Sequence, residues 1–193
     1  LGPPPGRTYP PFHDGGPEVR TGGGAEMARF ILEDLPEFLA GHLRLDPRRQ
    51  SLFGHSFGGL FALWLLFTRP EAFSTWIAAS PAITWEDSFV LDRLKTFDPG
   101  GRRLAVHLSA GEWEGDELAP FQRDRADSAE RLAQKSQTRT VTAARDMTER
   151  LSDLGLKATF EIYADETHMS VLPVAVNRAL RCAFSLSGIF PGR

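Results

Sequence analysis

A serine between glycines is the feature of this sequence that most directly suggests chemistry. Residues 54–58 read GHSFG, the pattern Gly-x-Ser-x-Gly. A serine in this pattern acts as a nucleophile when it lies on a sharp turn from a strand into a helix. The strand-like residues 50–54 and the apolar residues 60–67 flank it as such a turn requires. The pattern therefore predicts Ser56 as a nucleophile and the backbone N–H of Phe57 as an oxyanion donor, the alternative being a glycine-rich packing turn without chemistry.

A serine hydroxyl becomes an effective nucleophile only when a base takes its proton, so a histidine must come close to it in space. The chain has five histidines. His168 follows the last predicted strand, residues 158–163, in the loop position where this kind of fold carries its base. His107 lies inside a predicted strand and is expected to be structural. We therefore expect His168 to be the base, with a solvated loop histidine as the alternative.

A carboxylate should complete the constellation by fixing the tautomer of the histidine, in the chain order serine, acid, histidine. Three carboxylates follow the predicted strand 104–110, namely Glu112, Glu114 and Asp116. Each is a candidate for the acid, and each is also compatible with a solvated surface position.

The elements that must hold these residues alternate along the chain. Apolar runs predict strands at residues 50–54, 73–79, 104–110 and 158–163. Helical periodicity predicts helices at residues 25–43 with a kink at Pro36, 60–67, 141–154 and 171–184, and a charged excursion at 112–140. Strands alternating with helices indicate the α/β class, with a parallel sheet covered by helices on both faces.

Composition limits the domain organisation and the partners. Residues 1–24 are rich in proline and glycine and predict an irregular segment without strands, followed by a single catalytic core over residues 25–193. A net charge of -3 argues against nucleic-acid binding. No apolar run reaches the roughly 18 residues of a membrane span, and no signal pattern opens the chain, so a cytoplasmic location is expected. Without a metal-ligand cluster or a nucleotide-binding glycine pattern, we expect no metal and no cofactor.

Three segments carry a resemblance to a known family. Residues 53–63 read FGHSFGGLFAL, residues 80–85 read SPAITW, and residues 168–173 read HMSVLP. The chain resembles, over residues 22–190, the putative-esterase family of α/β-hydrolases, in particular the branch whose esterases open enterobactin-type siderophore trilactones. The resemblance implies an α/β-hydrolase fold and hydrolysis of a siderophore-like or other bulky ester through an acyl-enzyme on Ser56. The spacing Gly111-x-x-Glu114 also resembles that of the family, which ranks Glu114 above Glu112 as the acid.

The chain departs from this family before the nucleophile, where several strands are expected and none is predicted. We therefore expect a core that is incomplete at its N-terminus, a second oxyanion donor of unidentified source, and self-association through an exposed sheet edge. The partner is otherwise a small-molecule ester, and His55, Trp85 and Trp113 are candidates for contacts with it. An acyltransferase of the same fold and an inactive truncated hydrolase remain as alternatives.

Overall fold

The computed structural model describes residues 8–9 and 15–184. Contacts between residues group the chain into two compact units, residues 1–47 and 48–193. Each is described by itself, and the division into a segment 1–24 and a core 25–193 stays a prediction.

The first unit contains a small strand pair. Strands β1 (Thr8–Tyr9) and β2 (Val19–Arg20) pair in antiparallel orientation. The prediction that residues 1–24 hold no strand is therefore wrong at these positions. Two residues are too few for a periodic pattern, which is why these strands leave no sign in the sequence.

The helical part of the first unit is made of three consecutive segments. These are α1 (Gly24–Arg29), the π-helical turn η1 (Phe30–Asp34) and α2 (Leu35–Ala40). Pro36 lies in the first turn of α2, where the missing N–H of proline costs no helical hydrogen bond. The predicted kink at Pro36 is therefore replaced by a π-helical turn that precedes the proline.

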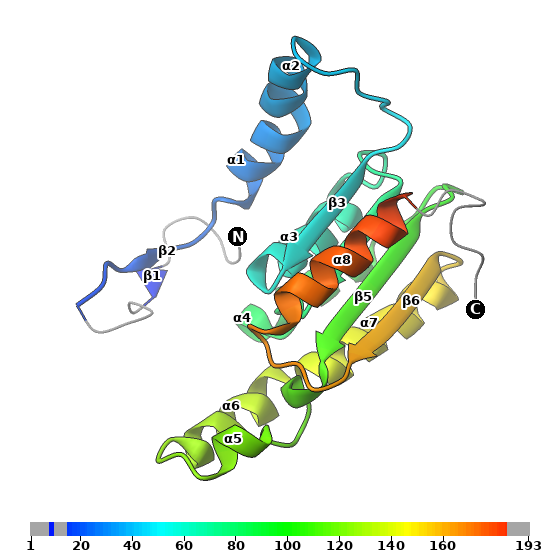
Figure 1. Cartoon of the computed structure of the whole chain (residues 1–193). Helices are drawn as coiled ribbons and strands as arrows, with labels where there is room; N and C mark the ends of the chain where they lie inside the picture. Colours follow the sequence, from blue (N-terminus) through cyan, green and yellow to red (C-terminus); the bar gives the residue numbers. More distant parts are fainter. Residues whose placement is uncertain (1–7, 10–14, 185–193) are drawn as a thin grey trace. The chain divides into compact units, whose positions relative to one another are not determined.

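The second unit is built on a parallel sheet of four strands. They are β3 (Ser51–His55), β4 (Thr75–Ala79), β5 (Ala105–Gly111) and β6 (Lys157–Tyr163). Their order in the sheet follows their order in the chain, so β3 forms one edge (Figure 1). The predicted α/β class is confirmed.

Helices cover both faces of this sheet. Helices α3 (Phe57–Thr68) and α7 (Thr140–Asp153) pack on one face, and α8 (Val171–Phe184) packs on the other (Figure 1). Helix α4 (Trp85–Lys95) packs against α3. Most residues of α3 are apolar and eight of its twelve are buried, which explains why its sequence shows no polar face. Within the described ranges, no helix has both the length and the apolar character that crossing a membrane requires.

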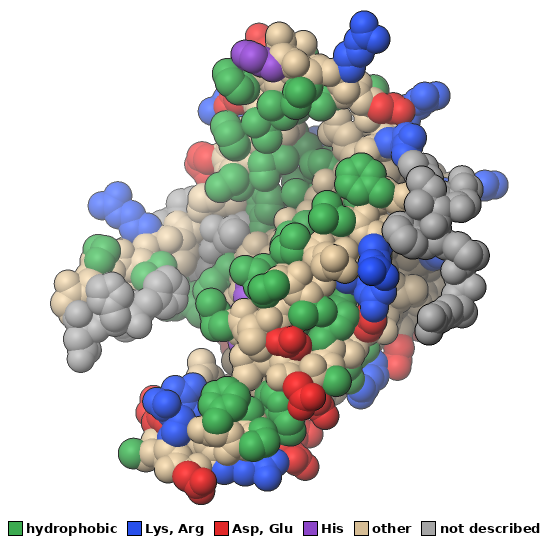
Figure 2. Space-filling view, in the orientation of Figure 1, with side chains coloured by type: hydrophobic (Ala, Val, Ile, Leu, Met, Phe, Trp, Pro, Cys, Tyr) green, Lys and Arg blue, Asp and Glu red, His purple; other side chains and the backbone are tan. Residues whose placement is uncertain are grey.

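The charged excursion lies between β5 and α7. It contains the 3₁₀ turn η2 (Glu112–Glu114), α5 (Pro120–Arg123) and α6 (Ser128–Thr138). Figure 1 places α5 and α6 beyond the carboxyl end of β5, and Figure 2 shows side chains of both charges over them. No residue of α6 is fully buried. This segment therefore borders the edge of the sheet at which all four parallel strands end.

Candidate active site

Ser56 occupies a strained turn between β3 and α3. Its backbone has φ 58° and ψ −118°, a conformation that costs a residue with a side chain about 1–3 kcal/mol. Backbone hydrogen bonds hold it there: the N–H of Ser56 donates to Ala79 O at 2.9 Å, and its carbonyl accepts from the N–H groups of Leu60 and Ala82. The turn thus presents the serine side chain at the carboxyl end of β3, as the sequence pattern predicts.

The glycines around this turn differ in the space that a side chain would have. A Cβ atom on Gly54 would lie 2.0 Å from the carbonyl oxygen of Gly58, and one on Gly59 would lie 3.1 Å from that of Ala79. A Cβ atom on Gly58 would meet no atom within 4 Å. Close packing therefore explains Gly54 and Gly59, whereas the second glycine of the pattern has open space beside it.

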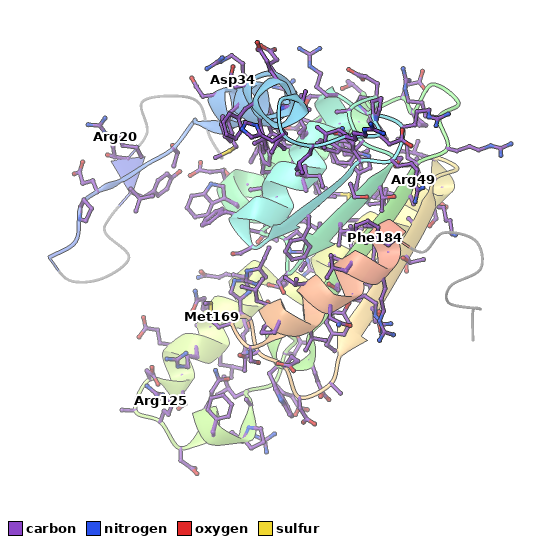
Figure 3. The ribbon with its side chains drawn as sticks, turned by 45° about the horizontal axis from the view of Figure 1, so that its top comes forward. Arg20, Asp34, Arg49, Arg125, Met169 and Phe184 are labelled. Carbon is purple, nitrogen blue, oxygen red and sulfur yellow. The ribbon has the colours of Figure 1, made fainter. Side chains whose placement is uncertain are left out.

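His168 lies within hydrogen-bonding distance of the serine. Its Nε2 is 3.0 Å from Ser56 Oγ, and its Nδ1 is 2.6 Å from Glu114 Oε2. An ionised carboxylate only accepts hydrogen bonds, so Nδ1 carries the proton and the free Nε2 accepts from the serine hydroxyl. Met169, labelled in Figure 3, marks this loop at the start of α8. The three side chains have the geometry of a nucleophile, a base and an orienting acid.

Glu114 is the buried member of this group, with a side chain only 4% exposed. Its Oε1 accepts hydrogen bonds from Ser80 Oγ at 2.5 Å and from the N–H of Gly111 at 2.8 Å. Burial opposes ionisation, but the hydrogen bonds from His168, Ser80 and Gly111 outweigh it, so the pKa of Glu114 lies below its usual value. Glu114 is therefore a stable anion next to His168.

The other two candidate acids lie elsewhere. Glu112 Oε2 accepts a hydrogen bond from the backbone N–H of Asp165 at 2.8 Å, so this side chain holds the backbone of the histidine loop. The side chain of Asp116 is exposed. Gly111 allows that loop to pack closely against it, because a Cβ atom there would lie 2.4 Å from the carbonyl oxygen of Glu166. The acid turn (η2, Glu112–Glu114) and the histidine loop (residues 164–170) are therefore in direct contact.

His55 supports the same loop. Its Nε2 lies 2.8 Å from the carbonyl oxygen of His168, to which it donates, and the two rings are 4.7 Å apart. Burial, followed by the charge of His168, lowers the pKa of His55, so this ring stays neutral at neutral pH. The structure places His55 against His168, a contact that the sequence did not reveal.

Three more candidates of the sequence analysis are Phe57, Trp85 and Trp113. Phe57 is the first residue of α3, so its N–H has no acceptor within the helix. The ring of Trp85 packs edge-on against the ring of Phe57, with 4.7 Å between centroids. Trp113 is half-buried, and its carbonyl accepts a hydrogen bond from Lys135 Nζ of α6. Lys135 thus connects the charged excursion to the acid turn.

Ser80 is the functional candidate that the sequence analysis missed. It is the first residue after β4, at the same edge of the sheet as Ser56 and Glu114. A search for polar residues directly after each predicted strand would have singled it out. Among residues 8–9 and 15–184, no cluster of His, Cys, Asp and Glu side chains is arranged to hold a metal ion.

Known proteins resemble the chain in sequence. The family model described as "Putative esterase" matches residues 16–174. Ferri-bacillibactin esterase BesA of Bacillus subtilis (strain 168) is 38% identical over 174 residues, which cover 86% of this chain and 54% of that protein. The siderophore enterobactin esterase of Emericella nidulans is 34% identical over 190 residues, covering 90% of this chain and 61% of that protein.

Solved structures resemble it in fold. The siderophore hydrolase EstA from Aspergillus nidulans matches with a TM-score of 0.76 and 31% identity, over 95% of this chain and 65% of that one. The enterobactin and salmochelin hydrolase IroE matches with a TM-score of 0.62 at 18% identity, over 85% of this chain and 58% of that one. These likenesses confirm the predicted α/β-hydrolase type of fold. The chain spans less than two thirds of the length of these relatives.

Proposed function

The chain belongs to the esterase family described as "Putative esterase", and from this premise we propose that it hydrolyses carboxylic esters through an acyl-enzyme on Ser56. The observation that carries the proposal is the pair of distances at His168, 3.0 Å to Ser56 Oγ and 2.6 Å to Glu114 Oε2. A hydroxyl, an imidazole and a buried carboxylate in this order make up the apparatus that activates a serine nucleophile.

In the proposed reaction, Ser56 Oγ attacks the ester carbonyl carbon while His168 Nε2 takes the hydroxyl proton. The N–H of Phe57 stabilises the resulting oxyanion, and the anion of Glu114 stabilises the imidazolium. When the intermediate collapses, the alkoxide leaves with the proton from His168, and the acyl group stays on Ser56. Water then attacks the acyl-enzyme with His168 again as base, which releases the acid and restores the serine.

We propose a siderophore-like or other bulky ester as the substrate class. Support comes from the printed names of the relatives, which are esterases of ferri-bacillibactin and enterobactin. The half-buried rings of Trp85 and Trp113 supply apolar surface at the carboxyl edge of the sheet, where such a substrate would lie. These names also favour water over an alcohol as the acceptor of the acyl group.

Labelling with a fluorophosphonate and turnover of a p-nitrophenyl ester test the proposal. The adduct is expected on the peptide that contains Ser56, and Ser56→Ala and His168→Ala are expected to lower kcat/KM about 10³-fold or more. Ser152→Ala and His42→Ala are matched controls, because among the described residues these side chains bond to backbone carbonyls four positions earlier in the chain, at Thr148 and Phe38. Retention of more than about a tenth of the wild-type turnover by either triad variant contradicts the proposal.

We also propose that the free edge of β3 is a site of association, since the described sheet places no strand beside it.

A further inference from the structure

Ser80 has an unusual backbone for a buried residue of its type. Its φ is 44°, in the left-handed region, and the residue is 1% exposed. Its N–H donates to the carbonyl oxygen of Ser109 at 2.7 Å, across the end of the β4–β5 pair. A strained conformation of this kind persists only where the surroundings fix it from several sides.

The hydroxyl of Ser80 donates a hydrogen bond that glycine could not donate. Glycine would adopt the positive φ at little cost, but it has no donor for Glu114. The single hydroxyl hydrogen of Ser80 goes to Glu114 Oε1 at 2.5 Å, because the ionised carboxylate can only accept. The N–H of Gly111 donates to the same oxygen, and His168 occupies the other. Both carboxylate oxygens are therefore held, and rotation of the group is blocked.

We propose that Ser80 is a positioning residue that fixes the carboxylate of Glu114 for its hydrogen bond to His168. The proposal rests on the proposed function, in which Glu114 orients the base, and it adds the residue through which that orientation is maintained. Ser80 acts only through Glu114.

The proposal predicts the direction in which the pKa of Glu114 changes when the Ser80 hydroxyl is removed. Burial raises the pKa of this carboxyl, and the hydrogen bonds from His168, Ser80 and Gly111 lower it below its usual value. The other titratable groups that interact with it are His55 of β3 and Lys135 of α6. Loss of the Ser80 hydroxyl leaves burial less opposed, so the pKa of Glu114 rises and the pair with His168 breaks at a higher pH.

The experiment compares Ser80→Ala and Ser80→Gly with the control Ser109→Ala. Ser80→Gly removes the hydroxyl and relieves the strained backbone, so it separates the loss of the hydroxyl from the strain of the positive φ. Ser109 is equally buried on the adjacent strand, and its hydroxyl does not bond to Glu114 among the described residues. We expect both Ser80 variants to lower kcat/KM for a p-nitrophenyl ester about 10- to 100-fold, with Ser109→Ala near wild type.

A second measurement separates this proposal from the proposed function. The proton that His168 Nδ1 shares with Glu114 is expected to give a far-downfield proton NMR signal in the wild type, whether or not esters are hydrolysed. In the Ser80 variants this signal should disappear at a higher pH than in the wild type or Ser109→Ala. An inactive chain that still shows this difference contradicts the esterase proposal and supports the role of Ser80.

A double-mutant cycle tests whether Ser80 acts through Glu114. In a Glu114→Gln background, Ser80→Ala should lower kcat/KM less than about twofold further, because the group that it positions is already lost. An undiminished effect in that background overturns the proposal. So do Ser80 variants whose kcat/KM and NMR signal both match those of Ser109→Ala.

Discussion

At the scale of single residues, His168 is held by its neighbours on three sides. Ser56 and Glu114 bond to its two ring nitrogens, while His55 contacts its ring and donates to its carbonyl. The ring itself is 44% exposed, so these contacts, and not burial, determine its orientation. A base held in this way needs little reorganisation when it takes a proton.

The two glutamates near His168 are predicted to differ in importance. Glu114→Gln is expected to lower kcat/KM about 10³- to 10⁴-fold, because an amide that donates to Nδ1 favours the wrong tautomer of the imidazole. Glu112→Gln keeps an oxygen that can accept from the N–H of Asp165, so a change of less than about fivefold is expected. Steady-state kinetics on both variants measures the difference. A severe loss in Glu112→Gln beside a normal Glu114→Gln would reverse the assignment of the acid.

Much of the site could be predicted at this scale, and part of it could not. The glycine pattern and the loop position selected Ser56 and His168, and the resemblance to the family ranked Glu114 above Glu112; the structure places Ser56, His168 and Glu114 in contact. The contacts of Ser80 and His55 depend on which loops the sheet order brings side by side. No sequence motif marks the contact of Ser80 with Glu114 or of His55 with His168, so neither could be predicted from the sequence.

At the scale of elements, the turn from β3 into α3 is the part with the least steric freedom. Its strained serine and its closest backbone approach, between Gly54 and Gly58, lie within five residues. The turn sets both the direction of α3 and the position of the nucleophile. Stability and activity are therefore coupled here.

Two glycine substitutions in this turn are predicted to have opposite outcomes. Gly54→Ala would bring a Cβ atom to 2.0 Å from Gly58 O, and we expect it to lower the free energy of unfolding by about 2–4 kcal/mol. Gly58→Ala has open space, and alanine favours the helix, so its effect should stay within about 1 kcal/mol. Urea denaturation followed by circular dichroism measures both. Equal losses of stability would show that the close approach of Gly54 to Gly58 is not what requires glycine in this turn.

The positions of the strands could be predicted largely from the pattern of apolar residues. All four strands of the sheet lie within two residues of their predicted limits, because each is an apolar run between polar segments. The π-helical turn at Phe30–Asp34 was not predictable in this way, since helical periodicity does not distinguish a single π-helical turn from α-helix. The pair of β1 and β2 is too short for any pattern.

At the scale of the whole molecule, the sheet of the second unit ends at β3, beside which the described residues place no further strand. The carbonyl of Gln50 and the N–H of Ser56 bond to the β4 side, so even-numbered residues of β3 face β4. Odd-numbered residues, from Ser51 to His55, turn their backbone groups toward the free edge. A row of such groups is a template for another strand.

Association through this edge is predicted to depend on the N–H of Ser51. Ser51→Pro removes that donor without breaking the ladder to β4, and it should weaken self-association, whereas Ser51→Ala keeps the donor and should behave as the wild type. Sedimentation velocity over a range of concentrations measures the effect. A wild-type chain that stays monomeric at every concentration, or a proline variant that associates as strongly, would exclude this edge as the contact.

The excursion between β5 and α7 has a consequence for how such proteins diversify. The segment leaves the sheet after Glu114 and returns at α7, which itself contacts η2, so its two ends meet. Surface segments with neighbouring ends tolerate exchange and insertion better than elements within a sheet. Recombination of residues 116–138 would alter the surroundings of the proposed site while Ser56, His168 and Glu114 are inherited unchanged. Lineages with this design can therefore acquire new substrates without rebuilding their chemistry.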